Sequence, residues 1–145
     1  YTEDAAENQD VVDRLLIKWE TAKTLVPQPD ISYSKKNKIG IISIGSCNDA
    51  IREARDVLKK QGQALNYLRV KAFPFNDQVE KFITQHEKIF VIEQNRDGQL
   101  HHMLITETNI DPRKLESLRF YNGIPIFAKD IIQKIEDRIN AGQAA

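Results

Sequence analysis

Apolar residues recur with two different periods along this chain, and the first stretch has the period of an α-helix. Within residues 1 to about 26, apolar side chains return at spacings of three and four, which places them on one helix face. Pro27 and Pro29 then end the helix, and residues 26–38 are predicted to form a polar, extended linker. The apolar face of the predicted helix consists of Val11, Val12, Leu15, Leu16 and Trp19.

From about Lys38 the pattern alternates between short apolar runs and amphipathic stretches. The predicted strands cover 39–45, 64–70, 88–93 and, more weakly, part of 114–123. The predicted helices begin at Ser46 or Asn48 as N-cap, at Asn76, near Asp97 and at Pro125. Gly62 is predicted to end the first of these helices. Such alternation is typical of right-handed crossovers, and it predicts a three-layer α/β/α fold with a mainly parallel sheet of four to five strands.

The same pattern divides the chain into two parts. Residues 1–37 are predicted to be an N-terminal amphipathic helix with a proline-containing linker, and residues 38–145 an α/β domain. A length of 145 residues fits one domain, which is large enough to fold without a disulfide or a metal ion. The first residue is Tyr1 and not Met, so we expect a chain that was processed or cut from a longer one.

Charge and cysteine usage exclude several classes of function. The 21 basic residues balance the 21 acidic ones, so the chain as a whole has no field that would attract nucleic acid or an anionic membrane. Cys47 is the only cysteine, which excludes an internal disulfide and a cysteine-rich zinc or iron–sulfur site. The apolar runs are too short to span a bilayer, and no signal peptide is visible, so a cytoplasmic protein is expected.

Two polar loops follow predicted strands directly. Parallel α/β folds place their functional loops at the carboxyl ends of the strands. The loop GSCND (45–49) follows the first predicted strand, and EQNRDG (93–98) follows the third. Both loops are therefore expected on one edge of the sheet, where this architecture exposes its working surface.

The loop at residues 45–49 has two interpretations. Its backbone N–H groups could bind an anion at a helix start, with Gly45, Ser46, Cys47 and Asn48 as the candidate residues. It lacks the second glycine and the Lys-Ser/Thr pair of a Walker loop, and a tight turn with a good N-cap is favoured. Cys47 could be a nucleophile near a helix start, but a partly buried, inert thiol is the favoured reading.

The loop at residues 93–98 is the more informative one. Glu93 and Asp97 could serve as acid and base, but nothing else in the chain completes an active site, so no catalytic residue and no metal ligand is predicted. The three histidines lack metal-ligand spacing, and YNGIP (121–125) is interpreted as a turn. We therefore expect a contact surface for another domain or subunit, formed by Glu93, Gln94, Asn95, Arg96, Asp97 and Gln99.

A set of short motifs resembles one known family. The chain is similar to the C-terminal region of the alpha subunit of 2-oxoacid:ferredoxin oxidoreductases, a region with a transketolase C-terminal-domain-like fold. The opening Thr2–Asp4 resembles the segment that leads into that region, and EQNRDGQL is the most specific match. The residues that carry the resemblance are Gly45 and Ser46, Glu53 and Ala54, Leu68 and Arg69, Pro74, and Glu93, Gln94, Asn95, Gly98, Gln99 and Leu100.

The resemblance implies a piece of a larger enzyme. The full enzyme oxidatively decarboxylates a 2-oxoacid, with 2-oxoglutarate as the expected substrate, using coenzyme A, and passes electrons to ferredoxin. Its cofactors are thiamine diphosphate, Mg²⁺ and a [4Fe–4S] cluster, and their binding motifs are absent here, since Arg96-Asp97-Gly98 only echoes the thiamine-diphosphate motif. The implied partners are the remainder of the alpha subunit and the thiamine-diphosphate-binding beta subunit, with ferredoxin as an indirect partner.

Two other readings stay open at the level of sequence. The chain could be a stand-alone α/β module that binds a nucleotide or coenzyme A at Gly45–Asn48. It could also be a sister enzyme of the wider transketolase-like group, although the other motifs of that group are not visible. The contacts to the 2-oxoacid would lie outside this chain, so its residues do not select the substrate.

Overall fold

The computed structural model describes residues 3–34 and 37–143, so residues 1–2, the linker residues 35–36 and residues 144–145 lie outside the described part. Five strands form one sheet: β1 (Asp30–Ser32), β2 (Ile39–Ile44), β3 (Asn66–Val70), β4 (Lys88–Glu93) and β5 (Leu115–Arg119). The helices are α1 (Ala5–Leu25), α2 (Asn48–Lys60), α3 (Asp77–Thr84), α4 (Gln99–Glu107) and α5 (Ala128–Gln143). Short 3₁₀ turns cover Gly45–Cys47 and Pro112–Lys114.

The sheet has the strand order β1-β3-β2-β4-β5. β2, β3, β4 and β5 run parallel, while β1 pairs antiparallel with β3 at one edge. The predicted α/β fold with a mainly parallel sheet is thus confirmed. The strand β1 lies within the segment predicted to be a linker, and its three residues are too few to give a periodic signal. The division of the chain between residues 37 and 38 stays a prediction. In the structure β1, from the predicted N-terminal part, pairs with β3 of the predicted α/β domain.

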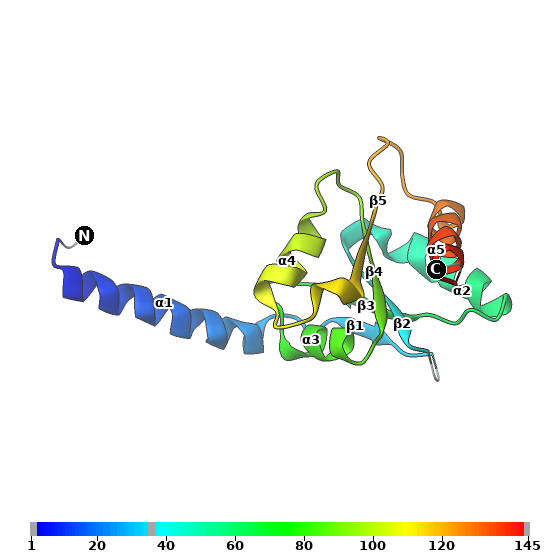
Figure 1. Cartoon of the computed structure of the whole chain (residues 1–145). Helices are drawn as coiled ribbons and strands as arrows, with labels where there is room; N and C mark the ends of the chain where they lie inside the picture. The colour runs from blue at the N-terminus through cyan, green and yellow to red at the C-terminus, as the bar shows by residue number, and fades with distance from the viewer. Residues whose placement is uncertain (1–2, 35–36, 144–145) are drawn as a thin grey trace.

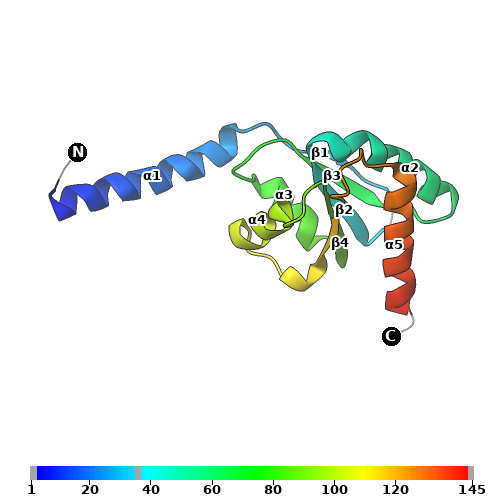
Figure 2. The ribbon, with the colours of Figure 1, turned by 90° about the horizontal axis from the view of Figure 1, so that it is seen from above.

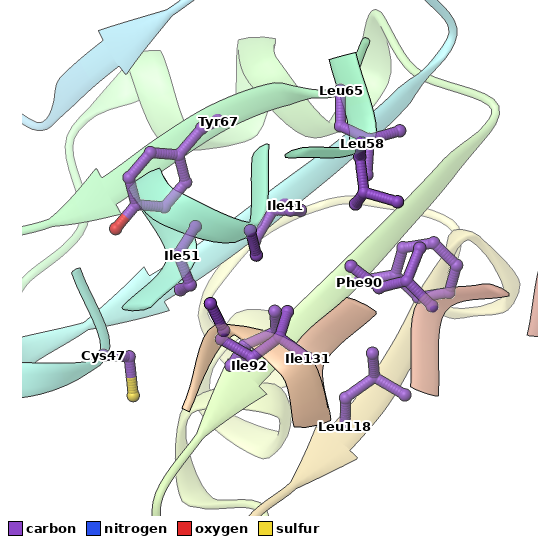
Figure 3. Packing of buried hydrophobic residues seen from close by; sticks show 13 residues of the cluster. Ile41, Cys47, Ile51, Leu58, Leu65, Tyr67, Phe90, Ile92, Leu118 and Ile131 are labelled. Carbon is purple, nitrogen blue, oxygen red and sulfur yellow. The ribbon is translucent and has the colours of Figure 1, made fainter. Parts of the chain in front are cut away.

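Helices cover both faces of the sheet (Figures 1 and 2). On one face α2 and α5 pack over a cluster that includes Ile41, Phe90 and Ile92, shown in Figure 3. On the other face α3 and α4 pack over a cluster that includes Ile42, Leu68 and Val91. Alternate residues of each central strand therefore enter opposite clusters, which explains why these strands read as continuous apolar runs in the sequence.

Some local signals are confirmed. Gly62 ends α2 with a φ of 87°, and the N–H of Gln63 donates to the carbonyl of Leu58 at 2.8 Å, as in a Schellman motif. The side chain of Asn76 caps α3 by accepting from the N–H of Gln78 at 3.1 Å.

Two predicted helix starts are wrong. No side chain caps α2, because Ser46 is taken up in the 3₁₀ turn and Asn48 is already helical. The amide of Asn48 donates instead to Asp49 at 2.8 Å. Helix α5 begins at Ala128, three residues after Pro125, because residues 120–127 form a longer loop than the turn signal indicated.

Helix α1 projects away from the sheet in both views (Figures 1 and 2). It has no buried residue, and its predicted apolar face is open, with Leu16 at 63% and Trp19 at 39% exposure. The Trp19 ring contacts the Phe73 ring edge-on at a centroid distance of 5.2 Å. The linker is also attached, because Oε1 of Gln28 accepts from the amide of Asn76 at 2.8 Å. The helix is therefore held at its C-terminal half only, and the rest presents apolar side chains to solvent.

Candidate functional site

Glu93 ends β4 and is almost completely buried, with 1% of its surface exposed. Its carboxylate accepts hydrogen bonds from the backbone N–H groups of Leu100 at 2.8 Å and His101 at 3.2 Å. These N–H groups belong to the first turn of α4, which has no partner for them within the helix and favours negative charge through its dipole. Glu93 was predicted as a contact residue, but its carboxylate is committed to the fold.

Asn95 and Gly98 complete the same arrangement. The amide of Asn95 donates to the Glu93 carboxylate at 2.6 Å, and its oxygen accepts from the N–H of Gly98 at 2.7 Å. Gly98 has a φ of 67°, in the left-handed region that side chains disfavour, and this conformation turns the chain into α4. The loop therefore satisfies its own backbone before it meets any partner.

The remaining predicted contact residues are exposed: Gln94, Arg96, Asp97 and Gln99. The guanidinium of Arg96 donates to both oxygens of Asp97, at 2.6 and 3.2 Å. This hydrogen bond is the main cause of a raised pKa of Arg96, and the nearby Tyr121 adds to it. The pair lies in solvent, where such ion pairs contribute little to stability, so both side chains can exchange this contact for one with a partner.

The two polar loops lie close together at the point where the strand order of the sheet reverses, next to β2. The chain leaves β2 for β3 on one side and then crosses to β4 on the other, and folds of this kind bind ligands at that point. The buried thiol of Cys47 lies at this point, near the backbone of Gln94 and the carboxylate of Glu93. Burial is the main cause of a raised pKa of Cys47, and the Glu93 carboxylate raises it further while the Gln94 backbone lowers it.

The anion-binding reading of residues 45–48 gains little from this geometry. Gly45 and Ser46 are exposed, whereas Cys47 points into the core. The loop therefore does not present its four candidate residues to one ligand. Because its pKa is raised, the Cys47 thiol also resists forming the thiolate that nucleophilic attack requires.

An exposed apolar loop lies beside the polar one and was missed as a site from the sequence. It joins β5 to α5 and carries Tyr121, Ile124 and Phe127, which are 61%, 56% and 48% exposed. In Figure 1 this loop and the β4–α4 loop rise from the same edge of the sheet. The side chain of Arg119, at the end of β5, links them by donating from Nη1 to the carbonyl of Arg96 at 2.8 Å.

A cavity of about 470 Å³ opens at the base of this loop, lined among others by Phe120 and Tyr121. Lys134 closes one side, with its ammonium 4.4 Å from the centre of the Phe120 ring. The sequence did contain a sign of this surface, because the segment FYNGIPIF (120–127) has five large apolar residues. Its Asn, Gly and Pro residues led to its interpretation as a turn only.

Metal-binding side chains do not gather at this edge of the sheet or in the rest of the described part of the chain. Within residues 3–34 and 37–143, no group of three or more histidine, cysteine, aspartate or glutamate side chains could hold a metal ion. His86 is buried, and its ring nitrogens are engaged with the carbonyl of Phe82 and the amide of Asn66. Among the helices that the structure describes, none is long and apolar enough to cross a membrane.

Comparison with known proteins finds similarity to part of one kind of enzyme subunit. No protein-family model matches the chain. The alpha subunit of 2-oxoacid:ferredoxin oxidoreductase 2 from Aeropyrum pernix is 28% identical over 107 residues, which is 72% of this chain and 16% of that protein. The alpha subunit of the enzyme from Saccharolobus solfataricus is 25% identical over an alignment of 146 residues, which covers 97% of this chain and 23% of that protein. The chain is homologous to part of a 2-oxoacid:ferredoxin oxidoreductase alpha subunit.

Solved structures agree on the fold. The 2-oxoglutarate:ferredoxin oxidoreductase from Magnetococcus marinus, solved with 2-oxoglutarate, coenzyme A and succinyl-CoA, superposes with a TM-score of 0.83 over 95% of this chain and 24% of that chain, at 22% identity. The alpha chain of a probable 2-oxoacid ferredoxin oxidoreductase from Thermoplasma acidophilum gives a TM-score of 0.53 at 23% identity, over 78% of this chain and 97% of that one. The chain spans less than a quarter of the length of the two alpha subunits it matches in sequence.

Proposed function

We propose that this chain is a structural and subunit-contact domain of a 2-oxoacid:ferredoxin oxidoreductase. The whole enzyme would oxidatively decarboxylate a 2-oxoacid, such as 2-oxoglutarate, with coenzyme A and ferredoxin in the cytoplasm, and this domain would be inactive alone. The observation that carries the proposal is that Glu93, the buried acid at the predicted working edge, is committed to capping α4. A carboxylate held by two backbone N–H groups serves the fold and is poorly placed to move protons.

Two exposed apolar surfaces support a contact role. The first is the loop with Tyr121, Ile124 and Phe127, beside the exposed polar residues of the β4–α4 loop. The second is the open face of α1, with Leu15, Leu16 and Trp19. Interfaces favour aromatic and apolar anchors surrounded by polar groups, and the first surface has this composition.

The partners of this domain follow from the same proposal. The loop surface would meet the thiamine-diphosphate-binding beta subunit, and α1 would pack against the remainder of the alpha subunit. Thiamine diphosphate, Mg²⁺ and the [4Fe–4S] cluster would be bound by those other parts of the enzyme. Ferredoxin would then be an indirect partner of this chain.

Assembly with the other parts of the enzyme tests the contact role. The chain would be produced together with the beta subunit and with the rest of the alpha subunit, and the complex isolated through a tag on the beta subunit. Tyr121→Asp and Ile124→Asp should lower recovery of this chain at least fivefold, because a charge would be buried in the interface. Tyr33→Asp is the matched control, since Tyr33 is also an exposed tyrosine, at 59%, but lies at the β1 side of the sheet.

Two outcomes would count against the proposal, one against the contact surface and one against the predicted inactivity of the isolated chain. Recovery of both loop variants at the level of the unchanged chain would refute the loop as the contact surface. Binding of thiamine diphosphate by this chain alone, measured by calorimetry, would refute the view that it lacks chemistry of its own.

A further inference from the structure

A second cavity, distant from the apolar loop, lies between α2 and the β1–β3 side of the sheet. It has a volume of about 440 Å³, within the range of small-molecule pockets. In Figure 2, α2 lies beside β1 and β3, and Arg55 of α2 donates to the hydroxyl of Ser32 of β1 at 3.2 Å. The walls of the cavity are residues of β1, α2 and β3.

Three arginines line this cavity: Arg52 and Arg55 from α2 and Arg69 from β3. None of them belongs to the ion pairs found in the described part of the chain. Two acids share the walls, but Asp30 pairs with Lys71 at 2.6 Å and Asp56 is exposed on α2. The cavity therefore has three arginines in its walls and one acid, Asp56, that is not paired with a lysine.

Arg69 gives the second observation. Its Nε atom is buried and has no hydrogen-bond partner among the described residues. A buried donor without an acceptor is unfavourable by about 1–3 kcal/mol, so such donors are rare in proteins unless a water, an ion or a ligand provides the acceptor. Arg69 also lines the cavity, so a turn of its side chain toward an oxyanion there would give this donor an acceptor.

Arg55 and Tyr67 fix the shape of the site. The Nε of Arg55 donates to the carbonyl of Leu65 at 3.0 Å, and Nη2 donates to the carbonyl and hydroxyl of Ser32 at 3.3 and 3.2 Å. Its guanidinium lies 5.4 Å from the centre of the Tyr67 ring. These contacts hold the guanidinium in place and leave its Nη1 without a protein acceptor in the described residues. Burial lowers the pKa of Arg55 and the neighbouring Arg52 lowers it further, while Tyr67 and Asp56 act in the opposite direction.

We propose that this cavity binds the phosphate group of a small organic phosphate, held by Arg52, Arg55 and Arg69. Guanidinium groups match the geometry of phosphate oxygens and donate to them in pairs. Three of them around one cavity suit a group with two negative charges better than a single carboxylate. The site differs from the Gly45–Asn48 loop considered from the sequence, since only Asn48 is common to both.

Inorganic pyrophosphate is the probe for this site. Calorimetric titration of the 145-residue chain should give saturable binding, and amide shifts in NMR spectra should centre on Ser32, Asn48 and Arg69. Arg52→Gln and Arg69→Gln should each weaken binding at least tenfold. Lys60→Gln is the matched control, because Lys60 is exposed on the same helix and does not line the cavity, yet its loss changes the net charge equally.

The alternatives give distinct results. Equal binding by all three variants would mean that pyrophosphate responds to overall charge only, which overturns the proposal. Tighter binding of succinate than of pyrophosphate would assign the site to carboxylates, such as acidic side chains of a neighbouring protein segment, and would also overturn it. If Arg69→Gln does not fold, as judged by circular dichroism, Arg52→Gln at its exposed position still decides the test. These measurements use the 145-residue chain alone, so their outcome does not depend on whether the proposed contact with the other subunits is correct.

Discussion

The carboxylate of Glu93 accepts a hydrogen bond from the backbone N–H of Leu100 at 2.8 Å, across seven residues of sequence. This contact ties the end of β4 to the start of α4 and determines how the polar loop between them folds. The residues in the middle of the loop, Arg96 and Asp97, are consequently held outward. Glu93, which was predicted from the sequence to contact a partner, thus positions Arg96 and Asp97, which are exposed and able to do so.

Removing this acceptor should destabilise the domain. Glu93→Ala leaves the N–H groups of Leu100 and His101 without their partner in a buried place, so we expect a loss of about 1–3 kcal/mol in the free energy of unfolding. Glu93→Gln keeps one oxygen acceptor and should lose less. Urea unfolding followed by circular dichroism measures both, and Asp97→Ala, an exposed control, should stay within about 0.5 kcal/mol of the parent. A fully stable Glu93→Ala variant would contradict this capping role.

Gly98 should not tolerate a side chain. Its φ of 67° is the left-handed conformation, which disfavours other residues by about 1–2 kcal/mol. Space is not the obstacle, because a Cβ atom would lie 3.4 Å from the Ser117 hydroxyl, an ordinary contact. Gly98→Ala should therefore lower stability by about 1 kcal/mol in the same urea assay. Gly98→Asn should lose less, because asparagine adopts this conformation more readily, and equal losses for the two would argue against backbone strain as the cause.

Cys47 should react slowly with thiol reagents and weaken the fold at high pH. Burial raises its pKa above the ordinary value of 9.0, so the folded state holds its proton longer than the unfolded state does. The resulting stability is fully present below pH 9.0 and is lost as pH rises through the folded pKa. Thermal unfolding between pH 8 and 11 should show this decline, and Cys47→Ala should make the decline shallower. An unchanged pH dependence in Cys47→Ala, or rapid labelling of folded protein by Ellman's reagent at pH 8, would contradict the burial of the thiol.

The attachment of α1 can be followed through its own fluorophore. Trp19 is the only tryptophan, and its ring meets Phe73 at a centroid distance of 5.2 Å. Phe73→Ala removes this contact, so the Trp19 emission should shift to the red and its anisotropy should fall, while the urea midpoint changes little because both rings are partly exposed. Phe127→Ala is the control, since Phe127 is also an exposed aromatic residue but lies in another loop. A Trp19 spectrum that is the same in all three proteins would show that α1 is not held at this point.

The sequence by itself determined most of the strands and helices of the domain, though not all of their ends. Continuous apolar runs predicted β2 and β4, and residues such as Gly62 and Asn76 set helix ends through contacts only a few residues away. Those signals are local, and a pattern of residues records local geometry directly. The short strand β1 was not predicted from the sequence, because only its pairing with β3 makes it a strand.

Tertiary structure alone decided what the polar residues do. Glu93 and Arg96 look alike in the sequence as charged members of one loop, yet one is buried as a helix cap and the other is exposed. Likewise Arg52 and Arg69 are seventeen positions apart, and only the packing of α2 beside β3 brings them to one cavity. Burial and neighbouring charge depend on segments that are distant along the chain, so they arise only once the strands and helices have packed.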